Sequence, residues 1–239
     1  MARRAGLNGG FTLKSDAERG PRNAERHQAV YAAALRLFRE KGYHATSMQD
    51  IAGVVGLYKG SLYHYIGGKE ELLVQVFERG MGALLEEVER IAANSAVGPT
   101  AQLREIIRAH VQAVATNLDA LTVYLHEWRA LGGESLARVR AQRERYVELV
   151  NAVIERGFLL GEFRAQDARI ATLGVLGMCN WLCQWYRPGG RLSPSEIGDR
   201  FADLVLDGLR ATTTAATTTT TTTFSSRPGR ARRPSRRKT

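Results

Sequence analysis

The sequence predicts an all-α protein, and three observations carry this prediction. Between residues 24 and 210, apolar side chains recur every three or four positions, as they do on one face of a helix. Glycine or proline interrupts this pattern repeatedly, at intervals typical of helix lengths. No stretch shows the strict apolar–polar alternation of a β-strand. We therefore expect a succession of helices joined by short turns.

The first helix is expected over residues 24–41, with Leu37 and Phe38 on its apolar stripe and Gly42 at its end. Ser47 and Asp50 then have the spacing of a capping box, although Glu or Gln is the usual partner, and they start a short helix that ends at residue 55. Further helices are expected at 59–65, from 69 to the Gly98-Pro99 break, and at 100–117, 120–131, 134–160, 166–186 and 194–210.

Residues 49–65 have the pattern of a helix-turn-helix. Apolar residues of the first helix, among them Ile51 and Ala52, pack under a turn made by Gly56, and Leu57 fills the core beneath it. The second helix would then enter a major groove and present the side chains of its first turn, Tyr58, Lys59, Gly60 and Ser61. The pattern alone also fits a plain antiparallel helix pair within a bundle.

Four short segments of this region distinguish a DNA-binding helix-turn-helix from a plain helix pair. Thr46-Ser-Met-Gln-Asp-Ile-Ala, Gly56-Leu, Lys59-Gly-Ser-Leu-Tyr-His-Tyr and Lys69-Glu-Glu-Leu together resemble the DNA-binding signature of the tetracycline-repressor (TetR) family. The resemblance implies an all-helical homodimer with an N-terminal three-helix head on operator DNA and a C-terminal bundle for ligand binding and dimerisation. It also implies a repressor released by a small-molecule effector. We expect a flexible arm over residues 1–23, the head over 24–70, the bundle over 71–210 and a disordered tail over 211–239.

The resemblance assigns the expected DNA contacts. Base contacts are expected from Lys59, Ser61, Tyr63 and His64, phosphate contacts from Thr46, Tyr58, Tyr65 and Lys69, with Ser47 and Gly60 completing the interface. The alternative for Tyr63 is a buried packing role. The sequence departs from the family pattern where Tyr58 replaces a Ser or Thr cap, Ile66 replaces Phe, and Gly67-Gly68 replaces a more polar pair.

The helix at 166–186 carries a second group of residues. Gly174, Gly177, Met178, Trp181 and Trp185 share one helical face. The run from Asn180 to Gly190, followed by Leu-Ser-Pro, resembles the TetR branch that senses acyl-coenzyme A thioesters of fatty-acid, phenylacetate or steroid degradation. Expected ligand contacts are Trp128, Arg129, Arg143, Tyr146, Gly177, Met178, Trp181, Trp185 and Arg187, with Arg129, Arg143 and Arg187 on phosphates. Expected dimer contacts are Leu173, Gly174, Leu204, Leu206 and Leu209. Ordinary packing is the alternative for the tryptophans, and a solvated, ion-paired face for the arginines.

The net charge of +10 does not itself indicate a DNA-binding body. Residues 27–210 contain equal numbers of acidic and basic residues, and the excess lies in the terminal segments, chiefly in the Arg-rich run after residue 226. This leaves a rival hypothesis: a helical binding protein that uses its basic tail on polyanions without sequence specificity.

The sequence contains no complete motif for metal-dependent, nucleotide-binding or nucleophilic catalysis. The His126-Glu127 pair has Ala130 where a zinc-protease motif needs its second histidine, and no phosphate-binding loop or nucleophile motif occurs. We therefore expect no enzyme activity, no metal and no cofactor. The apolar run at 171–185 is shorter than the ~20 residues of a membrane span. With Cys179 and Cys183 four positions apart in a helical stretch and no apolar leader, a reduced, cytoplasmic protein is expected.

Overall fold

The computed structural model describes residues 21–164 and 167–210, and it confirms the all-α prediction for these residues. Within them, the only β-type pairing is an isolated antiparallel bridge between Phe163 and Arg210. Most of the expected arm and all of the expected tail lie outside the described residues. The elements are α1 (Pro21–Lys41), α2 (Met48–Val55), α3 (Lys59–Leu62), α4 (Lys69–Ala93), α5 (Pro99–Thr116), α6 (Leu118–Glu127), the 3₁₀ turn η2 (Trp128–Ala130), α7 (Gly133–Leu159), α8 (Ala168–Trp185) and α9 (Pro194–Leu209).

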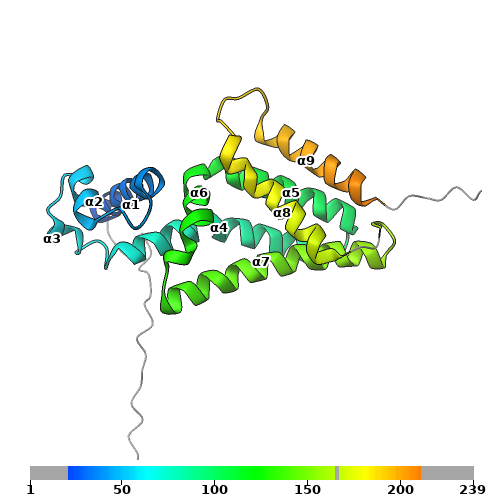
Figure 1. The fold of residues 1–239 in the computed structure, drawn as a ribbon, viewed down its shortest axis with the longest axis horizontal. Helices are drawn as coiled ribbons and strands as arrows, with labels where there is room; N and C mark the ends of the chain where they lie inside the picture. Colours follow the sequence, from blue (N-terminus) through cyan, green and yellow to red (C-terminus); the bar gives the residue numbers. More distant parts are fainter. Residues whose placement is uncertain (1–20, 165–166, 211–239) are drawn as a thin grey trace, which may run out of the picture.

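The helices form two groups joined by α4 (Figure 1). Helices α1–α3 gather at one end of the molecule, and α5, α7, α8 and α9 form a bundle toward the other end. Helix α4 runs from the first group into the second, and α6 lies beside it, in contact with both α1 and α4. The expected boundary between residues 70 and 71 therefore lies inside α4, and it stays a prediction.

Two hydrophobic clusters correspond to these groups. The larger one fills the bundle, with Leu103, Ile107 and Val150 fully buried. The smaller one, here called the head core, lies among α1–α4 and includes Phe38, Ile51 and Phe77. The head core also takes in α6 through three buried side chains, Ala120, Val123 and Tyr124. Because α6 contributes to this core, a movement of α6 changes the packing of the N-terminal helices.

Two local differences separate the structure from the expected elements. The helix expected at 59–65 is α-helical only over Lys59–Leu62, and tighter i→i−3 bonds from His64 and Tyr65 continue it as a turn. The helix expected at 120–131 begins earlier, at Leu118, and gives way to η2 at Trp128. One close approach demands glycine, because a Cβ on Gly157 would lie 2.1 Å from the Phe163 ring.

Candidate nucleic-acid interface and ligand cavity

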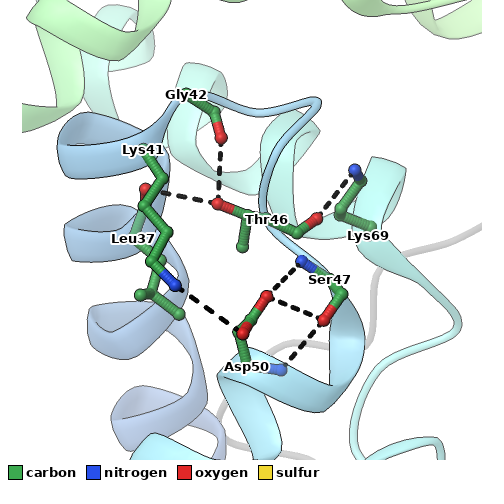
Figure 2. Close-up of polar contacts among 7 residues, drawn as sticks. All are labelled: Leu37, Lys41, Gly42, Thr46, Ser47, Asp50 and Lys69. Atoms are coloured by element: carbon green, nitrogen blue, oxygen red, sulfur yellow. Dashed lines mark hydrogen bonds and ion pairs between the residues drawn. The ribbon is translucent and has the colours of Figure 1, made fainter.

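Helix α2 begins and ends as the sequence predicts. The Ser47 hydroxyl accepts the Asp50 N–H at 3.1 Å, and the Asp50 carboxylate accepts the Ser47 N–H at 2.8 Å, which confirms the capping box (Figure 2). These hydrogen bonds, above all the one from the Ser47 backbone, lower the pKa of Asp50. At the other end, Gly56 adopts φ 67°, a left-handed conformation that glycine tolerates best. The turn into α3 is therefore built from local sequence.

Helix α3 presents most of the side chains expected to contact DNA. Tyr58 is 87% exposed, Tyr63 is 47% exposed, and Lys59, Gly60 and His64 are also exposed. The alternative that Tyr63 is a buried packing residue is wrong, because Leu62 takes that place with no exposed surface. Ser61 and Tyr65 are half-buried, and Tyr65 packs against the head core. Tyr58 makes no side-chain cap, which agrees with its departure from the family pattern.

The side chains of Thr46 and Lys69 make contacts inside the protein that the sequence did not predict. Thr46 is 1% exposed, and its hydroxyl donates toward the carbonyls of Gly42, at 2.9 Å, and Leu37, at 3.2 Å. The Lys69 ammonium donates to the carbonyls of Tyr43 and Thr46, both at 2.9 Å, and lies 4.2 Å from the centre of the Tyr43 ring. We call these contacts of Thr46 and Lys69 the Thr46–Lys69 lock, and Figure 2 shows those that join Thr46 to Leu37, Gly42 and Lys69.

The lock leaves Thr46 no surface for the phosphate contact expected from the sequence, whereas the phosphate contact expected of Lys69 stays a prediction. The single O–H donor of Thr46 is directed at carbonyls inside the protein, and the buried side chain has almost no surface to offer a phosphate. The Lys69 ammonium donates to two carbonyls of the turn between α1 and α2, which leaves one of its three N–H donors for another partner. Both side chains tie the turn between α1 and α2 to its neighbours, Thr46 to α1 and Lys69 to α4.

The bundle contains a small cavity between five helices. Its volume is about 50 Å³, and its walls come from α4, α5, α6, α7 and α8. The lining residues are Met81, His110, Tyr124, Leu125, Arg143, Tyr146, Val147, Leu176 and Asn180. Mixed apolar walls with a few polar side chains are typical of small-molecule sites.

A hydrogen-bonded chain of three side chains forms one wall of this cavity. The Tyr146 hydroxyl lies 2.8 Å from Nδ1 of His110, and Nε2 of His110 lies 3.1 Å from the Asn180 carbonyl oxygen. Burial lowers the pKa of His110 to about 4, so the imidazole is neutral at pH 7. A neutral imidazole that donates from Nε2 to Asn180 accepts the Tyr146 hydroxyl at Nδ1. The chain therefore satisfies its own polar atoms.

The cavity includes only part of the expected ligand set. Arg143 and Tyr146 line it, while the Trp128 ring stacks on the guanidinium groups of Arg129, at 4.5 Å, and Arg143, at 4.8 Å. Met178 packs against the bundle core. The remaining four expected residues are exposed and line no part of this cavity: Gly177, Trp181, Trp185 and Arg187. They are exposed because α8 turns its other face, with Leu176 and Cys179, toward α5 and α7.

Sequence reasoning missed most of the cavity wall, including His110, Tyr124 and Asn180. One signal was present. His110 stands between Ile107 and Val111 in an otherwise apolar stripe, where a polar residue requires a partner. No comparable signal marked Tyr124, because tyrosine is common in helix cores.

The expected dimer residues divide into two sets. Leu173 and Leu204 are 49% and 67% exposed, and Gly174 is exposed beside them on α8. Leu206 and Leu209 are instead 1% and 6% exposed in the bundle core, so they are unavailable to a second chain. The reason is that α9 packs along α5 through the face that carries these two leucines, and Leu204 points away from it.

Two other kinds of site, a membrane-spanning helix and a metal-binding cluster, are absent from the described residues. No helix there is both long and apolar enough to cross a membrane. No group of three or more His, Cys, Asp or Glu side chains in the described ranges is arranged to hold a metal ion.

Comparison with known proteins gives two family matches. Residues 30–76 match the family described as bacterial regulatory proteins, tetR family, and residues 96–209 match the tetracyclin repressor-like C-terminal domain. A curated relative, the HTH-type transcriptional repressor KstR2 of Rhodococcus jostii, is 30% identical over 74% of this chain and 87% of its own length.

Two solved structures share the fold at useful identity. The TetR family transcriptional regulator PfmR from Thermus thermophilus superposes with a TM-score of 0.68 at 34% identity, covering 76% of this chain and 98% of that one. AibR, solved in complex with isovaleryl coenzyme A and operator DNA, has a TM-score of 0.66 at 30% identity and covers 75% of this chain and 97% of its own.

Proposed function

Because this chain belongs to the tetracycline-repressor family of transcriptional regulators, we propose that it represses transcription as an operator-bound homodimer that an acyl-coenzyme A thioester releases. Its relatives are regulators of transcription and not enzymes. The observation that carries the proposal is the surface of α3, which presents Tyr58, Lys59, Tyr63 and His64 on a rigidly held helix-turn-helix.

The proposed DNA contacts follow from exposure and rigidity together. Lys59, Ser61, Tyr63 and His64 would read base edges, and Tyr58 and Tyr65 would reach phosphates. Gly60 leaves open space where its side chain would be, so the backbone of α3 approaches the groove closely. The Thr46–Lys69 lock supports this reading because it fixes the end of α1 against the helices that carry α3.

The proposed dimer surface lies on α8 and α9, which touch each other through the rings of Trp185 and Phe201. Large apolar side chains are exposed there. Helix α8 also contains Gly174 and Gly177, and a Cβ atom added to either glycine would have no neighbouring atom within 4 Å. We call this surface the α8–α9 face and define it by Ile170, Leu173, Trp181, Trp185 and Leu204. Its proposed occupant is the same face of a second copy, in the symmetric arrangement that self-association favours.

The proposed effector site is the cavity, and α6 is its link to the head. Tyr124 of α6 lines the cavity, while its ring packs edge-on against Phe77 of the head core, with centroids 5.1 Å apart. At the end of α6, the Glu127 carboxylate accepts the Tyr43 N–H at 3.1 Å, beside the Thr46–Lys69 lock. A ligand that binds more tightly when α6 is in another position would lower DNA affinity. The loss equals the difference between the ligand's binding free energies for the two positions.

The test measures the affinity of the protein for DNA fragments that flank its own gene, at physiological salt and in the presence of unrelated competitor DNA. The full chain and a chain that ends at Arg210 are measured side by side. Saturable binding by the shorter chain to one fragment supports an operator-specific regulator. Binding that requires residues 211–239 and ignores sequence supports the rival hypothesis of a polyanion-binding protein.

Lys59→Ala should weaken operator binding at least tenfold, because each half-site loses a charged contact from α3 worth about 1–3 kcal/mol. Fluorescence anisotropy with operator and scrambled duplexes measures the effect. The matched control is Arg90→Ala, an exposed cation near the end of α4 far from α3, whose ion pair with Glu87 is a surface one. Equal losses for both variants would contradict a role for α3 in reading DNA.

A further inference from the structure

We infer that the Tyr124 hydroxyl and the Arg143 guanidinium together bind the acyl oxygen of a short acyl ligand inside the cavity. The oxygen is a thioester carbonyl or a carboxylate, which present the same acceptor chemistry. The inference rests on the proposed function, because it takes the cavity as the effector site. It goes further by naming the two donors and the size of acyl group that they select.

The first observation is a buried donor without an acceptor. Tyr124 is 3% exposed, and its hydroxyl lies near the Arg143 guanidinium, which is a donor, but has no acceptor for its own proton in the described part of the chain. Burial raises the pKa of Tyr124, and the Arg143 charge opposes that rise, so the phenol remains protonated and able to donate at neutral pH. An unpaired buried hydroxyl destabilises the protein, and a ligand oxygen at this position would remove that penalty.

The second observation is a guanidinium held at the same wall. Arg143 lines the cavity, and its guanidinium carbon lies 4.8 Å from the centre of the Trp128 ring and 5.8 Å from that of Tyr124. Arginine carries donors and no acceptor, so it cannot satisfy a ligand donor. These two cation–π contacts hold the guanidinium at the cavity wall before a ligand arrives, which reduces the entropy lost on binding.

The Tyr146 and His110 side chains do not compete for this role. The Tyr146 hydroxyl is engaged by His110, and the His110 ring is engaged on both sides, by Tyr146 and Asn180. The open polar positions are therefore donors, and they select an acceptor oxygen. The apolar remainder, Met81, Leu125, Val147 and Leu176, suits a hydrocarbon chain.

The volume limits the length of that chain. A cavity of about 50 Å³ is a third of the ~150 Å³ that accommodates benzene in an engineered cavity. As it stands, the cavity therefore has room for the acyl oxygen and one or two carbon atoms beside it, and a larger group requires the helices to move apart. A short or short branched acyl group demands the smallest such movement, so we expect it to bind better than a long acyl chain or a steroid nucleus.

The test compares the wild-type chain with Tyr124→Phe by titration calorimetry, using isovaleryl-coenzyme A, free isovalerate, palmitoyl-coenzyme A and coenzyme A. Tyr124→Phe removes only the hydroxyl, so we expect an unchanged or higher melting temperature. We expect its affinity for isovaleryl-coenzyme A to fall at least tenfold. Tyr186→Phe, a buried tyrosine of the bundle core outside the cavity lining, is the matched control and should bind like the wild type.

Each outcome bears on the inference. A loss confined to isovaleryl-coenzyme A identifies a thioester carbonyl, and a loss with isovalerate identifies a carboxylate; either supports the pair of donors. Unchanged affinity in Tyr124→Phe, or no binding of either short ligand by the wild type, would overturn it. Tighter binding of palmitoyl-coenzyme A than of isovaleryl-coenzyme A would overturn the size limit. Operator binding without ligand is measured on the same samples, so a failed inference is distinguished from a failed repressor assignment.

Discussion

A Trp181→Glu variant should be monomeric and should bind operator at least a hundredfold more weakly than the wild-type chain. Trp181 is 65% exposed in the α8–α9 face and is surrounded there by the apolar side chains that define that face. Burying a large apolar side chain contributes about 1.5–3 kcal/mol, and a two-fold interface counts each residue twice. The substitution also brings two carboxylates toward each other in an apolar contact.

The loss of operator binding follows from geometry. A dimeric helix-turn-helix protein reads two half-sites about 34–36 Å apart, so a single head retains only half of the contacts. Sedimentation equilibrium measures the mass, and anisotropy with the operator measures the affinity. Leu159→Glu is the matched control, because Leu159 is an 85% exposed leucine at the end of α7 and outside the α8–α9 face. A dimeric Trp181→Glu variant, or a monomeric wild type at micromolar concentration, would contradict the assigned interface.

A Lys69→Met variant should lose about 2–4 kcal/mol of unfolding free energy. Methionine keeps most of the side-chain volume but removes two charge-assisted hydrogen bonds, each worth about 1.5–3 kcal/mol before discounting for partial exposure. It also removes the cation–π contact with Tyr43, worth about 0.5–1 kcal/mol. The carbonyls of Tyr43 and Thr46 would then depend on water for their partners.

Urea unfolding measures the change, and Lys59→Met is the matched control because it makes the same replacement on an exposed lysine of α3. That control should stay within about 0.5 kcal/mol of the wild type while losing operator affinity. The two lysines thus separate stability from DNA contact. If Lys69→Met kept full stability and lost only operator affinity, Lys69 would contact a DNA phosphate as the sequence predicts. The stabilising role of the Thr46–Lys69 lock would then be contradicted.

Features that depend on neighbouring residues were predictable from the sequence. The capping box joins Ser47 to Asp50 across three positions, and Gly56 ends α2, so both are determined within one helical turn. The exposed side chains of α3 follow from the same local geometry once Leu62 is placed inward. The order of helices and the resemblance to the TetR signature are likewise properties of short segments.

Features that depend on which helix faces which were not predictable in this way. Leu204 and Leu206 are two positions apart in one amphipathic helix, and only the packing of α9 on α5 decides that Leu206 is buried and Leu204 exposed. The large flat ring of Trp181 suits the wall of a ligand pocket, yet the orientation of α8 leaves this side chain exposed on the surface. Thr46 and Lys69 have side chains suited to phosphate, yet each reaches carbonyls of the turn between α1 and α2.

The sequence by itself therefore determined the fold class, the helix-turn-helix and the family, because short-range hydrogen bonds and helical periodicity encode them locally. Only the tertiary structure decided the cavity. Its wall gathers Met81, His110, Tyr124, Arg143 and Asn180 from five helices that are distant in the chain. Whether a tyrosine hydroxyl there has a partner depends on the distances between those helices, and side-chain type and spacing along the chain do not contain that information.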